Sequence, residues 1–147
     1  AIDLDGALGD TRPLWTDWLA SVAPLLGVDA GGLPADRGKA AAELDRLGAG
    51  NWRALLERFS EERAPLYLRR DATMAATLRA LAGEGREIGV FTDAPEPLAR
   101  VALAQLGADR RIEVLETGEG ALDRVLARLG TDALVVRART ELDGDAA

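Results

Sequence analysis

The hydrophobic pattern of this chain changes near Gly85. Before that residue, apolar side chains recur every three or four positions, which is the spacing of one buried face of a helix. After it, short apolar runs alternate with helical segments, as in a chain that alternates strands with helices. The expected helices span residues 14–26, 39–47, 52–59, 72–81, 95–106 and 119–129, and the expected strands span residues 87–93, 111–115 and 132–136.

Glycine, proline and a capping residue set the boundaries of several of these elements. Asn51 is expected to cap the helix that follows it, and Pro65 is expected to mark the end of that helix. At the start of the chain, only Ala1 and Ile2 precede two acids, so the first strand is expected to begin upstream of Ala1. Residues 141–147 have the composition of the first turns of a further helix.

Strands that alternate with helices predict a parallel α/β sheet covered by helices on both faces. In such sheets, ligands bind at the carboxyl ends of the strands. Several polar side chains fall at these expected ends: Asp3, Asp5, Thr92, Asp93, Glu116 and Arg137. The sequence therefore places its candidate site at that edge of the sheet.

The opening stretch carries two carboxylates, Asp3 and Asp5, where the first strand ends. If Ile2 and Leu4 face the core, residues 3 and 5 share the opposite face, and Gly6 lets the backbone turn away. One acid could then attack an electrophile while the other transfers a proton, or both could bind a divalent cation. The alternative is a solvated acidic turn, since Asp-x-Asp-Gly also occurs in loops and is similar to part of a calcium loop.

Composition narrows the possible chemistry. The 147 residues, 48% of them hydrophobic, are enough for one core and a small insertion. The chain has no Cys and no His, which excludes disulfides, thiolate metal sites and histidine bases. The net charge of -7 argues against nucleic acid and anionic membranes as partners. No apolar run approaches the roughly 20 residues that cross a bilayer, and no leader precedes the first residue, so the expected location is the cytoplasm.

Two motifs resemble those of the haloacid dehalogenase superfamily. The run Asp3-Leu4-Asp5-Gly6-Ala7-Leu8 is similar to the first motif of that family, D-x-D-G-T-L, with alanine in place of threonine. The run Val90-Phe91-Thr92-Asp93 is similar to the second motif, an apolar strand that ends in Thr or Ser. Order and spacing resemble the phosphatase-like branch, in which a helical cap follows the first strand. The resemblance implies a Rossmann-like α/β core from residues 1–13 and 84–147, and a cap from residues 14–83.

The same resemblance implies a role for each matching residue. Asp3 would attack phosphorus to form an aspartyl phosphate, and Asp5 would protonate the leaving group and later activate water. Thr92 would donate a hydrogen bond to the phosphoryl oxygens. The rest of the phosphate-binding set would be Gly6, Asp93 and Ala94. The family also needs a lysine and a magnesium ion, which Asp3 and the backbone carbonyl of Asp5 would help to hold.

The lysine and one metal ligand of the family are substituted here. The third motif puts Glu116 at the lysine position, and Ala138 stands where the fourth motif has an acid. Arg137 could supply a cation to the acids and bind a phosphate, or it could be a surface residue at a strand end. Three acids could replace the missing ligand if their loop bends inward: Glu141, Asp143 and Asp145. Weak magnesium binding is therefore expected.

Three functions stay open at this point. The first is a phosphohydrolase for a small phosphorylated metabolite, with weak or lost activity because Glu116 and Ala138 replace charged partners. The second is a catalytically degenerate relative that serves as a binding or regulatory domain. The third is a 2-haloacid dehalogenase, which needs no metal, but that branch lacks the acid found at Asp5. Neither the substrate nor the oligomeric state can be read from the sequence.

Overall fold

Three parallel strands form the sheet of this protein. The computed structural model describes residues 1–146, with side chains through residue 144. Strands β1 (Ile2–Asp3), β2 (Gly89–Thr92) and β3 (Val114–Thr117) pair in the order β1-β2-β3. A single parallel bridge joins Ile2 to Val136 on the other side of β1. The expected α/β fold with a parallel sheet is confirmed, and the strand that carries Asp3 has a neighbour on each side.

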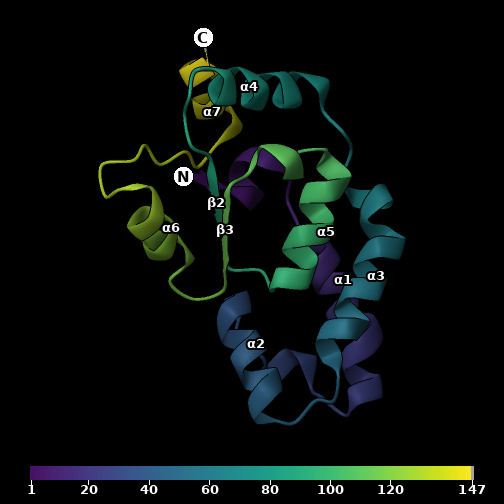
Figure 1. Ribbon diagram of the computed structural model, residues 1–147. Helices are drawn as coiled ribbons and strands as arrows, with labels where there is room; N and C mark the ends of the chain where they lie inside the picture. Colours follow the sequence, from purple (N-terminus) through teal and green to yellow (C-terminus); the bar gives the residue numbers. More distant parts are fainter. Residues whose placement is uncertain (147) are drawn as a thin grey trace.

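Seven α-helices surround this sheet in the described part of the chain (Figure 1). They are α1 (Arg12–Val22), α2 (Arg37–Arg46), α3 (Trp52–Tyr67), α4 (Ala72–Gly83), α5 (Glu96–Leu106), α6 (Ala121–Leu129) and α7 (Arg139–Ala146). A π-helical turn, η1 (Leu4–Leu8), follows β1, and three short 3-10 turns are η2 (Ala23–Leu26), η3 (Ala30–Gly32) and η4 (Asp109–Arg111). Among these helices, none is both long enough and apolar enough to cross a lipid bilayer.

Two of the expected strands differ from the observed ones. Within residues 132–136, only Val136 pairs, because a turn closed by the Ala133 N–H on the Gly130 carbonyl takes up the start of the run. The strand expected at 111–115 begins instead at Val114 and continues to Thr117, because η4 occupies the residues before it. The apolar runs located these segments but did not fix their pairing.

The helix start expected after Asn51 is confirmed at Trp52, but the cap expected from the Asn51 side chain and the helix end expected at Pro65 were wrong. The Asn51 side chain makes no capping hydrogen bond to α3. Helix α3 continues past Pro65 to Tyr67, and the Leu68 N–H closes its last turn on the Ala64 carbonyl at 2.8 Å. Ala64 is buried, so packing of the helix face outweighs the local effect of a proline in the last turn.

The two faces of the sheet bury different groups of side chains. Phe91 and Val114 pack against Ala121 and Val125 of α6 on one face, while Val90 belongs to the larger core on the other. Figure 1 shows α6 and α5 on opposite sides of β2 and β3. Helices therefore cover both faces of the sheet, as expected for parallel strands.

The helices of residues 14–83 lie around the core rather than on one side of it. Helix α3 packs against α5, and α4 packs against α7 at the opposite end of the molecule from α2 (Figure 1). Trp15, Trp18 and Trp52 form a buried cluster within α1 and α3. One continuous set of buried residues joins these helices to the sheet, and the division into cap and core stays a prediction.

Gly6 is required in η1 for space rather than for an unusual backbone angle. Its φ is not positive, so the expected reason, conformational freedom at a sharp turn, does not apply. A Cβ atom at this position would instead overlap the backbone carbonyl oxygen of Arg137. The turn after β1 and the segment after Val136 therefore approach so closely that no side chain fits between them.

We expect Gly6→Ala to lower the free energy of unfolding by at least about 2 kcal/mol, because two backbone segments must separate to admit the methyl group. Gly83→Ala is the matched control, because Gly83 lies in α4 with open space around it. This second change should be neutral, or stabilising by up to about 1 kcal/mol. Urea denaturation of both variants measures the difference, and equal midpoints would contradict the close approach at Gly6.

Candidate functional site

The carboxylates of Asp3 and Asp5 leave the sheet in different directions. β1 ends at Asp3, and Asp5 already belongs to the π-helical turn, so the two residues do not share one strand face as expected. Asp3 is in register with Phe91 and faces α6, whereas Asp5 faces Thr11 and Thr92. The one hydrogen bond between the acids runs from the Asp5 N–H to Asp3 Oδ1, at 3.2 Å.

Asp5 is saturated with hydrogen-bond donors. Its Oδ1 accepts from the Thr11 N–H at 2.9 Å and from Thr11 Oγ1 at 2.6 Å. Its Oδ2 accepts from Thr92 Oγ1 at 2.8 Å and from Arg37 Nη2 at 2.6 Å. Because a carboxylate offers about four lone-pair sites, Asp5 has none left for a substrate while these partners stay in place.

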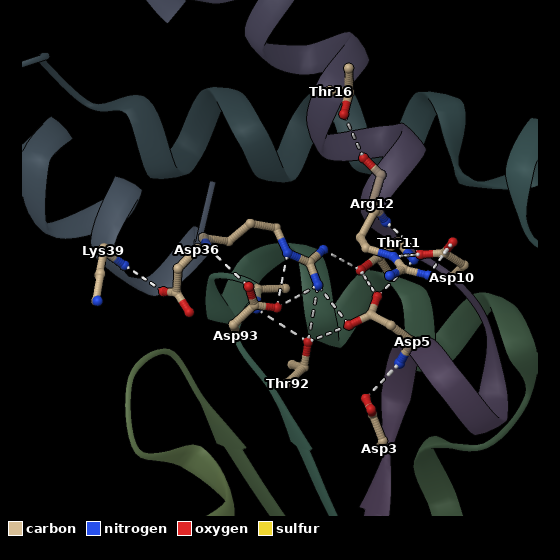
Figure 2. A network of polar contacts seen from close by, with 12 residues as sticks. Asp3, Asp5, Asp10, Thr11, Arg12, Thr16, Asp36, Lys39, Thr92 and Asp93 are labelled. Atoms are coloured by element: carbon tan, nitrogen blue, oxygen red, sulfur yellow. Dashed lines mark hydrogen bonds and ion pairs between the residues drawn. The ribbon is translucent and has the colours of Figure 1, made fainter. Parts of the chain in front are cut away.

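Arg37 is a functional-site residue that the sequence analysis did not identify. It lies at the start of α2, and only 2% of it is exposed. Its Nη2 is 2.6 Å from Asp5 Oδ2 and 2.7 Å from Asp93 Oδ1, and its Nη1 donates to Thr11 Oγ1 at 2.6 Å. Its Nε also donates to Asp93 Oδ1, at 3.1 Å, and its backbone N–H donates to Asp93 Oδ2, at 3.0 Å. Figure 2 shows Asp5, Thr11, Thr92 and Asp93 gathered in this network, with Asp3 outside it.

Local sequence explains how α2 brings Arg37 to the strand ends. Asp36 caps the helix by accepting from the Lys39 N–H at 2.9 Å. Gly38 then allows close approach, since a Cβ there would be 2.6 Å from the Glu119 backbone nitrogen. An Asp followed by a glycine in the first turn was a readable sign of a helix start, but nothing in the pattern indicated which residue would point into the core.

Thr92 and Asp93 lie at the end of β2, next to the acids of the first motif. Thr92 is buried, donates its hydroxyl proton to Asp5 and accepts from the Ala94 N–H at 3.2 Å. Burial would raise the pKa of Asp93, but the hydrogen bonds and charge of Arg37 outweigh it and hold that pKa below its ordinary value. Both side chains are therefore committed to internal partners.

Glu116 and Arg137 are not part of this network. Arg137 is exposed, with its guanidinium 5.7 Å from the ring centre of Phe91, and the cation that contacts Asp5 and Asp93 is Arg37. Glu116 pairs with Arg124 of α6 at 3.2 Å, on the strand farthest from β1. Arg124 also donates to the carbonyls of the loop that follows β3.

The acids near Asp3 do not gather into a cluster of metal-ligating side chains in the described part of the chain. In the described part of the chain, no group of three or more acidic side chains lies close enough to hold a metal ion. Glu141 turns back and accepts from the Arg137 N–H at 3.3 Å, and Asp143 is exposed. The side chain of Asp145, the third expected substitute, lies outside the described residues. A hard divalent ion needs several oxygen ligands, which these residues do not provide.

Asp3 is the one acid of the first motif that faces open space. A cavity of about 300 Å³ lies beside it, and its polar lining comes mainly from Asp3, Thr92, Asp93 and Asp123. Burial and the negative charge of Asp5 raise the pKa of Asp3 above its ordinary value, against the lowering effects of backbone N–H groups and Arg137. The cavity is therefore lined by acids, and Asp3, unlike Asp93, does not contact Arg37.

No protein-family model matches this chain, and no curated protein shows significant similarity to it.

Asp93 should stabilise the fold at neutral pH and lose this effect in acid. Its pKa in the folded protein lies below the ordinary value of 3.8, so its contribution is complete above that pH and disappears as the pH falls through the lower folded value. We expect Asp93→Asn to cost about 1 kcal/mol at neutral pH, a modest figure because the side chain is partly exposed. Denaturant unfolding of wild type and variant at several pH values should show this difference shrinking below pH 3.8. The exposed Asp109→Asn, as control, should show no such pattern.

Asp3→Asn and Asp5→Asn should change stability in opposite directions. Removing the charge of Asp3 relieves the cost of burying it and its repulsion from Asp5, so we expect a gain of up to about 1 kcal/mol, limited by solvent screening. Removing the charge of Asp5 leaves the buried Arg37 with a weaker partner, so we expect a loss of about 2 kcal/mol or more. Thermal unfolding at neutral pH measures both, and a loss of stability in Asp3→Asn would show that its carboxylate is held by favourable contacts.

Proposed function

We propose that this protein is a hydrolase of the haloacid dehalogenase type, with a site like that of phosphomonoester phosphatases and weak turnover of a small phosphorylated metabolite. One observation carries the proposal: the Asp3 carboxylate stands at the carboxyl end of β1, beside a cavity, with Asp5 and Thr92 adjacent. Ligands of parallel α/β sheets bind at this edge, which supports the same assignment.

In the proposed reaction, a carboxylate oxygen of Asp3 attacks phosphorus, and the bond from phosphorus to the ester oxygen breaks. The leaving alkoxide takes up a proton from Asp5, the role that the first motif gives to this residue. A water molecule then attacks the aspartyl phosphate and releases inorganic phosphate. For Asp5 to act, at least one of its donors must first release it, since all its lone pairs are engaged.

Charge explains why turnover should be weak. The cavity beside Asp3 has three carboxylates in its lining and no Lys or Arg. A phosphate ester that enters it meets repulsion that a lysine or other cation would normally offset. Glu116 at the expected lysine position and Ala138 at the expected metal-ligand position remove both sources of positive charge.

The occupation of Asp5 favours a second candidate, a catalytically degenerate binding or regulatory domain. A proton carrier bound by four donors, one of them from a buried arginine, is fixed as a structural element. In such a domain, the cavity would recognise a ligand without transforming it. A 2-haloacid dehalogenase is the third candidate, and the presence of Asp5 argues against it because that branch lacks this acid.

Phosphate release from a broad panel of phosphomonoesters tests the proposed function. We expect wild-type turnover near background, since losing one charge contact to the transition state typically costs about two to three orders of magnitude in rate. Asp3→Asn should abolish the remaining activity. Glu116→Lys combined with Ala138→Asp, assayed with magnesium, should raise the rate at least tenfold if the rest of the site is intact.

The outcomes separate the candidates. Wild-type turnover of several per second would contradict a weakened site, and activity that survives in Asp3→Asn would remove Asp3 as the nucleophile. A wild type that releases halide from 2-haloacids and hydrolyses none of the phosphomonoesters would favour the dehalogenase. No turnover by any variant, together with saturable binding of a phosphomonoester, would favour the binding domain.

A further inference from the structure

One nitrogen atom occupies the position between two acids of the site. Nη2 of Arg37 is within 2.7 Å of both Asp5 Oδ2 and Asp93 Oδ1. A point that touches two carboxylates at this distance is where a cation binds most favourably. The side chain of Arg37 is 3% exposed, so this cation is almost completely withdrawn from solvent.

The arrangement is fixed from several directions. The buried Thr11 accepts a hydrogen bond from Nη1 of Arg37, and the Arg37 backbone N–H donates a further hydrogen bond to Asp93. The guanidinium is planar and permanently charged, and four of its N–H groups are matched to carboxylate or hydroxyl acceptors. A second cation near Asp5 would meet both this charge and a carboxylate without free lone pairs.

We propose that Arg37 is a built-in cation that takes the place of a metal ion between Asp5 and Asp93, and that it fastens α2 to the ends of β1 and β2. The acids of the site are thereby balanced by the chain itself, so the folded protein neither needs nor admits a divalent ion between these two residues. Asp3, which Arg37 does not contact, keeps a carboxylate that faces the cavity.

The inference predicts that removing Arg37 converts this point into a cation site. Asp5 and Asp93 would then face each other across a space that a small divalent ion can fill with water and carboxylate ligands. Arg37→Gln is neutral and shorter, so it frees that space. The role proposed for Arg37 concerns charge and stability, so the experiment measures unfolding rather than turnover. The proposal for Arg37 and the proposed hydrolase function can therefore fail independently of each other.

Thermal unfolding of the full chain, in EDTA and in millimolar MgCl2 at matched ionic strength, is the test. The wild-type midpoint should be the same in both. Arg37→Gln should lower it by about 6 °C or more in EDTA, since a buried pair is broken. Magnesium should restore a few degrees, and this response should be lost in Arg37→Gln combined with Asp93→Asn. Arg100→Gln, which breaks an exposed pair with Glu96, is the control. Its midpoint should stay close to that of the wild type in EDTA and should not rise in magnesium.

If Arg37→Gln does not fold, Arg37→Lys and Asp93→Asn test the proposal in its place. Lysine keeps the positive charge but not the planar set of N–H donors of the guanidinium. We therefore expect a smaller loss of stability and no magnesium response. Asp93→Asn keeps Arg37 on Asp5 and should likewise ignore magnesium. A wild-type or Asp93→Asn midpoint that rises with magnesium would overturn the proposal, as would an Arg37→Gln protein no less stable than Arg100→Gln.

Discussion

The buried guanidinium of Arg37 is the interaction on which the site depends. Withdrawing a charge from water is costly unless partners replace its hydration, and here Asp5, Asp93 and Thr11 do so. To reach them, α2 must meet the strand ends closely, which Gly38 permits against the loop after β3. The charge balance of the site therefore depends on the position of α2, and that position depends in turn on the contacts of Arg37.

This interaction divides the expected catalytic pair into two unequal halves. Asp5 is enclosed with a cation and two hydroxyls, and it behaves as part of the framework. Asp3 faces a cavity instead, and burial and the charge of Asp5 raise its pKa. In the proposed reaction, the nucleophile would therefore be accessible, whereas the proton carrier would be held by Arg37 of α2.

A second arginine fixes the turn that carries both acids. Arg139, at the start of α7, donates to the backbone carbonyls of Ala7 at 2.6 Å and Leu8 at 3.0 Å, and it pairs with Asp71 at 2.5 Å. Asp71 in turn caps α4. The π-helical turn after β1 is thus bound from one side through Asp5 and from the other through its carbonyls, which fixes the direction of Asp5 relative to Asp3 at the end of β1.

The sequence alone determined the helices, the strand before Thr92 and the presence of acids at a strand end, because periodicity and motif spacing are local properties of the chain. It did not determine the pairing of residues 132–136, which depends on the turn that takes up the start of this run and leaves only Val136 in a bridge with Ile2. It also left open whether Arg137 is a cation for the acids or a surface residue, and it did not single out Arg37. Arg137 is adjacent to the motif but exposed, whereas Arg37 reaches Asp93 from 56 positions away along the chain. Only the tertiary structure could select between them, because a buried ion pair forms where elements meet, and no local pattern records which residue of a helix start will meet the sheet.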